Sequence, residues 1–194
     1  IIEAGQYSFA DGLFYGGDGP VWSNRVLGAI LDAFGQKATE IIVFDLHTGA
    51  GPYGYPALLS VSPVDHAGLG WGAEIFGPAM VPVITGRVAT TNTGIAATAT
   101  GYVSDFIRRS MPQARVLPLV MECGTLSSAE MLRRIVDDNW LHLFGKVDSE
   151  RGRRIKADLL HGFIPQDDSW QNICLATSRR HFSTALNALK KEIG

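Results

Sequence analysis

The sequence has little cysteine, no long apolar run and little excess charge of either sign. Its two cysteines, Cys123 and Cys174, form no CxxC pair, so we expect no disulfide scaffold, and a reducing cytoplasm is the default compartment. No apolar run approaches the ~20 residues that cross a bilayer. The first residues also lack the basic-then-apolar order of a signal peptide. We therefore expect a cytoplasmic protein that has no membrane partner.

The charge is balanced, and this argues against a nucleic-acid partner. The formal net charge is −2, and Lys and Arg cluster only mildly, as in residues 151–154. The chain has 194 residues, of which 46% are hydrophobic and 19% charged. This composition predicts a single globular domain over residues 1–194 with a real core.

The N-terminal segment GQYSFADGLFYGGDGPVWSN, residues 5–24, is rich in glycine and aromatic residues. We interpret it as an ordered loop, because aromatic side chains bury area that a flexible linker leaves in water. Ser23 is then predicted to cap a helix over residues 24–34, which Gly35 ends.

The rest of the chain alternates between apolar runs and helical patterns. Residues 47–80 are expected to be mostly loop, and the polar segment 85–93 is expected to line a surface or cleft. Strands are predicted over residues 40–46, 81–84 and 115–121, and helices over 96–109, 128–139, 150–160 and 170–191. The alternation predicts an α/β sandwich with a largely parallel sheet.

The helical spacing also predicts which side chains the helices bury. In the helix after Ser127 or Ser128, one apolar face holds Met131, Leu132, Ile135 and Val136. In the last helix, the residues expected to point inward are Leu175, Phe182, Leu186 and Leu189.

Two predicted strands end in chemically active side chains. One ends in Asp45-Leu46-His47, followed by glycines at 49, 51 and 54, and the other ends in Glu122. In open α/β sheets the ligand site lies beyond the carboxyl ends of the strands. If the two strands are parallel, His47 and Glu122 lie at the same edge of the sheet. Asp45 alternates with His47, so both side chains project from the same side of a regular strand.

Each of these residues also has a purely structural interpretation. In that interpretation His47 is a hydrogen-bonded residue at the end of a strand, and Asp45 caps a turn. Glu122 is harder to explain in this way. It follows an apolar strand directly, and it must either reach a cleft or cost several kcal/mol to bury unpaired.

Three segments resemble a known family. GQYSFADGLFYGGDGPVWSN, FDLHTGAGPYG and MECGTLSSAEMLRRIVDDNWLH are similar to the C-terminal part of the zinc carboxypeptidase superfamily, in a bacterial branch, over nearly the whole chain. The resemblance implies an α/β fold with a mixed, mostly parallel sheet sandwiched by helices. It also implies that His47 is the third zinc ligand and Glu122 the general base, and their separation fits the family's spacing. Asp45 is then placed to orient the imidazole ring.

The chemistry of zinc hydrolases agrees with this assignment, but the ligand set is incomplete. A catalytic zinc needs three protein ligands, and the family takes its first two from an upstream HxxE motif. This sequence has no HxxE, because the residues three positions after His66, His142, His161 and His181 are Leu69, Gly145, Ile164 and Thr184. We expect the chain to be the C-terminal part of a longer protein, the alternative being a truncated relative, and to bind zinc weakly by itself.

The resemblance leaves three functions open. The first is a zinc-dependent hydrolase that cleaves a peptide C-terminus, and the second is a deacylase of N-acyl amino acids. The third is a non-catalytic binding module with a degenerate metallopeptidase fold. An incomplete sheet exposes strand edges, so we also expect self-association or pairing with an upstream segment of the same protein.

Three further residues are weaker candidates for substrate binding. Tyr102 lies roughly where relatives keep a tyrosine over the substrate, although its segment equally suits the buried face of a helix. Arg87 has a planar fork that suits a substrate carboxylate, or else it is a solvated surface residue. Tyr53 either lines a cleft or packs beside the glycine loop. Cys123, next to Glu122, is interpreted as a small buried cysteine.

Overall fold

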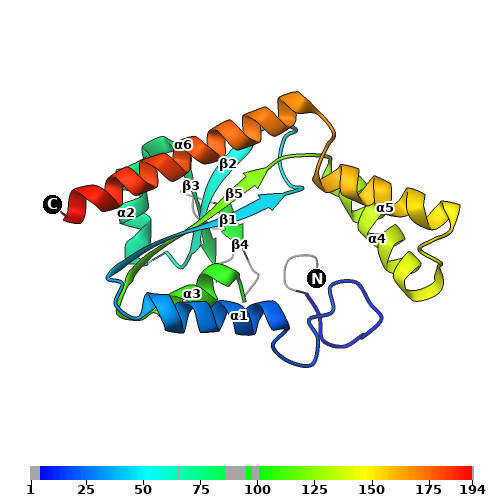
Figure 1. Cartoon of the computed structure of the whole chain (residues 1–194), viewed down its shortest axis with the longest axis horizontal. Coiled ribbons are helices and arrows are strands. Elements are labelled where there is room, and N and C mark those ends of the chain that lie inside the picture. Colours follow the sequence, from blue (N-terminus) through cyan, green and yellow to red (C-terminus); the bar gives the residue numbers. More distant parts are fainter. Residues whose placement is uncertain (1–4, 65, 86–94, 98–100, 194) are drawn as a thin grey trace.

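The computed structural model describes residues 5–64, 66–85, 95–97 and 101–193 of the chain. Within them one sheet has the strand order β1-β5-β2-β3-β4 (Figure 1). Its strands are β1 (Glu40–Thr48), β2 (Pro56–Ser62), β3 (Met80–Thr85), β4 (Ile95–Ala97) and β5 (Arg115–Cys123). β2 runs antiparallel to β5, and the other pairings are parallel. The predicted α/β fold with a mixed, mostly parallel sheet is confirmed.

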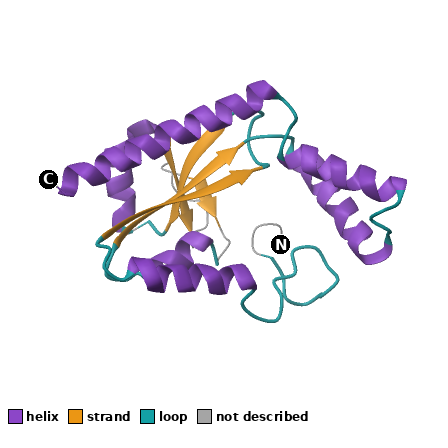
Figure 2. Ribbon diagram, viewed as in Figure 1, coloured by secondary structure: helices purple, strands orange, loops and turns teal. Residues whose placement is uncertain are grey.

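Helices cover both faces of this sheet (Figure 2). The α-helices are α1 (Trp22–Ile30), α2 (Ala67–Phe76), α3 (Val103–Ser110), α4 (Ser128–Phe144), α5 (Glu150–Phe163) and α6 (Asp168–Ile193). α1 and α3 pack on one face, α2 and α6 on the other, and α4 and α5 form a hairpin beyond the carboxyl ends of β1 and β5 (Figure 1). None of the helices in the described residues is both long enough and apolar enough to span a bilayer.

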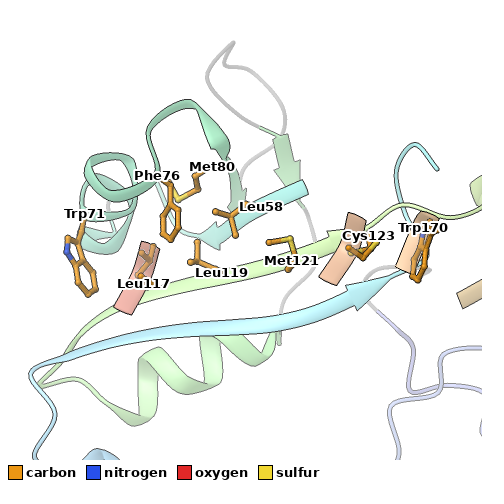
Figure 3. Close-up of a cluster of buried hydrophobic side chains, with 11 residues drawn as sticks. Leu58, Trp71, Phe76, Met80, Leu117, Leu119, Met121, Cys123 and Trp170 are labelled. Atoms are coloured by element: carbon orange, nitrogen blue, oxygen red, sulfur yellow. The ribbon is translucent and has the colours of Figure 1, made fainter. Parts of the chain in front are cut away.

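The main core lies between the sheet and the pair α2 and α6. Leu117, Leu119 and Met121 of β5 are at most 1% exposed and point toward Trp71 and Phe76 of α2 or toward α6 (Figure 3). Burying one such side chain contributes about 1.5–3 kcal/mol to folding. These odd-numbered residues of β5 share one face, so the even-numbered residues, Glu122 among them, face the other side of the sheet.

The opposite face of the sheet is covered over only part of its length. Ile107 of α3 and Met111, directly after that helix, pack on Val116 of β5, together with residues of α1 and the first half of β1. These contacts cover the beginnings of β1 and β5. The ends of the same two strands, where His47 and Glu122 lie, are left to form the walls of cavities.

The prediction that residues 47–80 are mostly loop is wrong, because they contain β2 and α2. Ser60 and Ser62 look like loop residues in the sequence, yet both are buried in β2. The glycines of α2 allow the helix to lie close to the sheet. A Cβ at Gly68 would lie 2.2 Å from the Val116 carbonyl oxygen, and one at Gly72 would lie 2.6 Å from Met80 Sδ.

Two predicted helix starts are also wrong. The first helix begins at Trp22 after Val21, so Ser23 lies inside its first turn, and a π-helical turn at Leu31–Gly35 follows. The helix predicted over residues 96–109 begins only at Val103, after β4. The predictions are confirmed for the strands at 81–84 and 115–121 and for the last two helices. Ser127 caps α4 through a capping box with Glu130.

The expected inward face of α6 is wrong in most of its positions. Leu175, Phe182 and Leu186 are 51%, 53% and 42% exposed, and Leu189 is partly buried. The residues that α6 does bury are Trp170, Cys174, His181 and Ala185. α6 therefore packs on the sheet through a different face from the one that these apolar residues predicted.

The N-terminal loop is ordered, but its aromatic residues do not bury the area that we expected of them. Tyr7 and Phe9 are 74% and 72% exposed. The loop is held instead by Gln6, whose side chain donates to the Phe9 and Leu13 carbonyls and accepts from the Ser8 and Phe9 amides. A backbone bridge between Gln6 and Tyr15 closes the loop.

Candidate functional site

The two polar strand ends lie side by side. β1 and β5 are parallel neighbours, and His47 is the register partner of Glu122. Both side chains, and that of Asp45, project from the face opposite the main core, as their alternation along the strands requires. The expectation that the imidazole and the carboxylate lie at the same edge of the sheet is therefore confirmed.

His47 lies between two carboxylates. Its Nε2 is 3.0 Å from Asp45 Oδ2, and its Nδ1 is 3.8 Å from Glu122 Oε2. A carboxylate next to Nε2 favours the neutral tautomer that carries its proton there and leaves the lone pair on Nδ1. The nitrogen that faces Glu122 is then the one able to bind a metal ion or to accept a proton.

Glu122 is held at the floor of this site. Its side chain is 15% exposed, and its Oε1 accepts a hydrogen bond of 3.0 Å from the Ala50 amide. Burial raises the pKa of Glu122, and the Ala50 amide and His47 oppose that rise only in part. A carboxylate with a raised pKa is a stronger base than an exposed one, which suits proton transfer.

The glycines after His47 shape the loop that supplies the Ala50 amide. Gly49, Gly51 and Gly54 have positive φ values of 123°, 96° and 67°, a backbone conformation that other residues seldom adopt. The loop then crosses the end of β5, where a Cβ on Gly124 would lie 2.0 Å from the Pro52 carbonyl oxygen. The Trp170 indole donates a 2.8 Å hydrogen bond to the Gly124 carbonyl, which ties this crossing to α6.

One cavity, of about 450 Å³, lies beside His47 and Glu122 on the side of β2, β3 and α3. Its floor is apolar and includes Leu59, Val61 and Val83, while Asp45, Tyr102 and Ser104 supply polar groups. Ser104 is 8% exposed, and its Oγ is a buried oxygen that has no hydrogen-bond partner among the described residues. We call this space the α3 cavity.

A second cavity, of about 530 Å³, lies on the other side of the same pair. Its walls are the loop from Thr48 to Ala50 together with Phe14, Ser128, Met131, Leu132, Ile135 and Phe163. We call it the α4 cavity. His47 and Glu122 line both cavities, so a molecule that fills both must pass directly over them.

The described residues supply too few donors to hold zinc by themselves. His47 Nδ1 is a suitable ligand, but among the described residues no group of three or more His, Cys, Asp or Glu side chains has the arrangement of a metal site. A catalytic zinc needs three protein ligands and an open position. The donors present therefore fit part of such a site, one imidazole with a carboxylate facing it.

The three weaker candidates have different outcomes. Tyr102 lines the α3 cavity and also packs against the buried pair Val61 and Val83, so both of its interpretations describe it in part. Tyr53 is 52% exposed, and its hydroxyl donates a 2.7 Å hydrogen bond to Asp167 at the start of α6. This contact gives Tyr53 a structural role. Arg87 lies outside the described residues.

Cys123 and His66 also have structural roles. Cys123 is buried. Its burial, and to a lesser extent the neighbouring Cys174, raises the pKa of the thiol to about 12, and so high a pKa does not suit a nucleophile. His66 Nε2 lies 2.7 Å from the Val116 carbonyl oxygen, before the first turn of α2.

Several cavity residues were not identified from the sequence as site residues. Ser104, Phe14 and Phe163 come from segments distant from both strand ends, and no motif connects them with His47. Ile135 was predicted to lie on an apolar helix face, and that pattern does not distinguish a core from a cavity wall.

Comparison with known proteins assigns the family. No curated protein and no solved structure matches the chain. The family model described as "Protein of unknown function (DUF2817)" matches residues 1–177. The match covers most of the sequence, including both strand ends and the α4–α5 hairpin, and the chain therefore belongs to the DUF2817 family.

Proposed function

We propose that the chain carries part of the active site of a zinc-dependent hydrolase that cleaves amide bonds and resembles the zinc carboxypeptidases. One observation carries the proposal. The Nδ1 atom of His47 faces a half-buried carboxylate of the neighbouring strand at 3.8 Å, and the pair lies where two cavities meet. A purely structural histidine at a strand end has no need of such cavities.

In this proposal His47 is a zinc ligand and Asp45 positions it. Zinc, when bound, polarises the scissile carbonyl and makes water a better nucleophile. Asp45 at Nε2 keeps the Nδ1 lone pair directed at the ion. The remaining donors come from outside the described residues, as an HxxE motif supplies them in the zinc carboxypeptidases.

Glu122 is the general base. It takes a proton from the attacking water and gives it to the nitrogen of the leaving amine. The Ala50 amide holds one of its oxygens, and the other is the one that lies near His47. The proposed substrates are a peptide C-terminus or an N-acyl amino acid, with its two halves in the two cavities.

The test is Glu122→Gln in the full-length protein, assayed against a panel of peptides and N-acyl amino acids. We expect a loss of kcat of at least about a hundredfold. The zinc content, measured by mass spectrometry, stays unchanged. Glu74→Gln, on the exposed side of α2, is the matched control and keeps full activity.

His47→Ala separates the two roles, because it removes a zinc ligand and leaves the base in place. We expect it to lower both the zinc content and the turnover. A wild-type protein that holds zinc but cleaves no member of the panel, or a Glu122→Gln variant with normal rates, would contradict the proposal. Ligand binding without turnover would then favour the non-catalytic module.

A further inference from the structure

The α4 cavity differs chemically from the α3 cavity. Among the described residues that line it, only His47 and Glu122 can carry a charge, and the other polar side chains are Thr48 and Ser128. The loop amides are engaged elsewhere, since Gly49 N–H donates to the Cys123 carbonyl and Ala50 N–H to Glu122. This space therefore offers apolar surface and few hydrogen bonds to an occupant.

One helix face supplies most of the apolar wall. Met131, Leu132 and Ile135 follow at helical spacing along α4, and Phe163 at the end of α5 lies opposite Gly49. A Cβ on Gly49 would approach the Phe163 ring to 3.0 Å, so the loop and the ring are already in contact there. Val136, the next residue along α4, is 44% exposed and is not among the residues that line the cavity.

The hairpin that carries this wall is braced. Lys156 Nζ lies 2.6 Å from Asp138 Oδ1, and Arg134 Nε donates to the Asp158 carbonyl at 3.1 Å. The Arg151 guanidinium stacks 3.9 Å from the centre of the Trp140 ring. These contacts link α4 to α5, so the wall is a preformed surface, as ligand pockets usually are.

Phe14 closes the cavity from the N-terminal loop. Its φ is +60°, and among the described residues it alone combines a side chain with a positive φ. The Phe14 carbonyl accepts from the Gln6 amide at 3.0 Å, and Asn139 of α4 contacts the Asp11 carbonyl at 3.4 Å. The loop thus keeps an aromatic ring at the cavity in a backbone conformation that residues with a side chain seldom adopt.

We propose that the α4 cavity is the acyl-binding site and that the preferred substrates carry an uncharged, bulky apolar acyl group. This inference rests on the proposed function. The α3 cavity then takes the amine half, because the hydroxyl groups of Tyr102 and Ser104 suit the polar groups that an amino acid carries. The acyl half, which has none, fits the apolar wall.

The test uses the full-length protein and two substrates that differ in one group, an N-octanoyl and an N-acetyl derivative of the same amino acid. Each methylene buried in an apolar pocket is worth roughly a fourfold gain. We therefore expect the wild type to prefer the octanoyl substrate by at least about fiftyfold in kcat/KM. Ile135→Trp fills the cavity and is expected to lower this preference by about tenfold or more.

Two further variants provide a control and a second test of the cavity. Val136→Trp adds the same ring at the neighbouring, outward-facing position, and it leaves the preference unchanged. Phe14→Ala removes one wall without touching a helix, so it tests the cavity even if Ile135→Trp folds poorly. We expect it to lower the octanoyl preference by roughly threefold to tenfold.

The readout that does not need turnover is the binding of octanoate, measured by calorimetry. It is present in the wild type and in Val136→Trp, and it is lost in Ile135→Trp. Failure of the wild type to cleave any amide contradicts the proposed function but leaves this binding test intact. Equal octanoyl preference and equal octanoate binding in wild type and Ile135→Trp overturn the acyl-site inference, whether or not the protein is a hydrolase.

Discussion

Asp45 Oδ2 lies 3.0 Å from His47 Nε2, and both side chains come from the same strand. Two residues of alternation along β1 place the carboxylate and the imidazole on one face of the sheet. The contact occupies the nitrogen that points away from Glu122, so it determines which ring atom is available on the side of the cavities. The proposed role of His47 therefore depends on Asp45, which the alternation of side chains along β1 places beside the imidazole ring.

Replacing Asp45 with Asn tests this dependence. The amide keeps the shape of the side chain but weakens the charge that favours a proton on Nε2. We expect the full-length protein to bind zinc about 10- to 100-fold more weakly, as the loss of such a ring-orienting partner usually causes. Competition with a chelator measures the affinity. Asp137→Asn, on an exposed part of α4, is the control, and equal zinc affinities of the two variants would contradict the role of Asp45.

Gly124→Ala tests the crossing of the glycine loop over the end of β5. The new methyl group would lie 2.0 Å from the Pro52 carbonyl oxygen, so the backbone has to shift. We expect a loss of about 1–3 kcal/mol in the free energy of unfolding. Chemical denaturation of the purified chain measures it.

Gly70→Ala is the matched control for that substitution. A Cβ at Gly70, within α2, meets no atom within 4 Å, and alanine favours helices over glycine by up to about 1 kcal/mol. The control is therefore expected to be neutral or stabilising. If both variants unfold at the same denaturant concentration, the loop crossing does not require glycine.

His181 makes the stability of the fold depend on pH. Its side chain is 6% exposed in α6, beside the ring of Phe76. Burial lowers the pKa of His181, and the positive charge of Arg180 lowers it further. The unfolded chain then binds a proton more readily than the folded chain does. Stability is therefore full above the unfolded pKa of about 6.5 and falls as the pH drops toward the lower folded pKa.

His181→Phe removes this titration and keeps a ring against Phe76. We expect the free energy of unfolding of the variant to change less than that of the wild type between pH 7.5 and pH 5, as measured in urea. His142→Phe, at an exposed position near the end of α4, controls for the loss of an imidazole as such. A wild-type slope preserved in His181→Phe would assign the acid sensitivity to other groups.

The sequence predicted the strand ends well because apolar runs and polar ends are local signals. Glu40 and Arg115 begin two strands of equal length, so the polar ends at His47 and Glu122 coincide once the strands are parallel. The position of Asp45 followed from alternation alone. These features need no knowledge of the rest of the chain.

The cavities could not be predicted, because they arise from contacts between distant segments. Phe14 and Phe163 meet the loop after His47 only through the placement of the N-terminal loop and the α4–α5 hairpin. β2 was missed for a related reason. Its serines look solvent-exposed in the sequence, yet Ser60 and Ser62 are at most 1% exposed in the fold. Tertiary packing overrode the local pattern in both cases.

The edge of β1 leads to a prediction about association. Within the described residues β1 pairs only with β5, so its other edge presents free backbone groups. Leu46 is 71% exposed beside it, and Phe182 of α6, 53% exposed, lies 5.8 Å from the ring of Phe44. Exposed strand edges flanked by apolar side chains favour pairing with another chain.

We expect the 194-residue chain to self-associate in solution through this edge. Leu46→Lys places a charge where another strand would dock, and it is expected to weaken the association by roughly tenfold. Light scattering over a concentration series measures the effect. Val147→Lys adds the same charge at a 54% exposed position between α4 and α5, and it should leave the association unchanged. A wild-type chain that stays monomeric at all concentrations would mean that the edge of β1 is protected by its own twist and side chains.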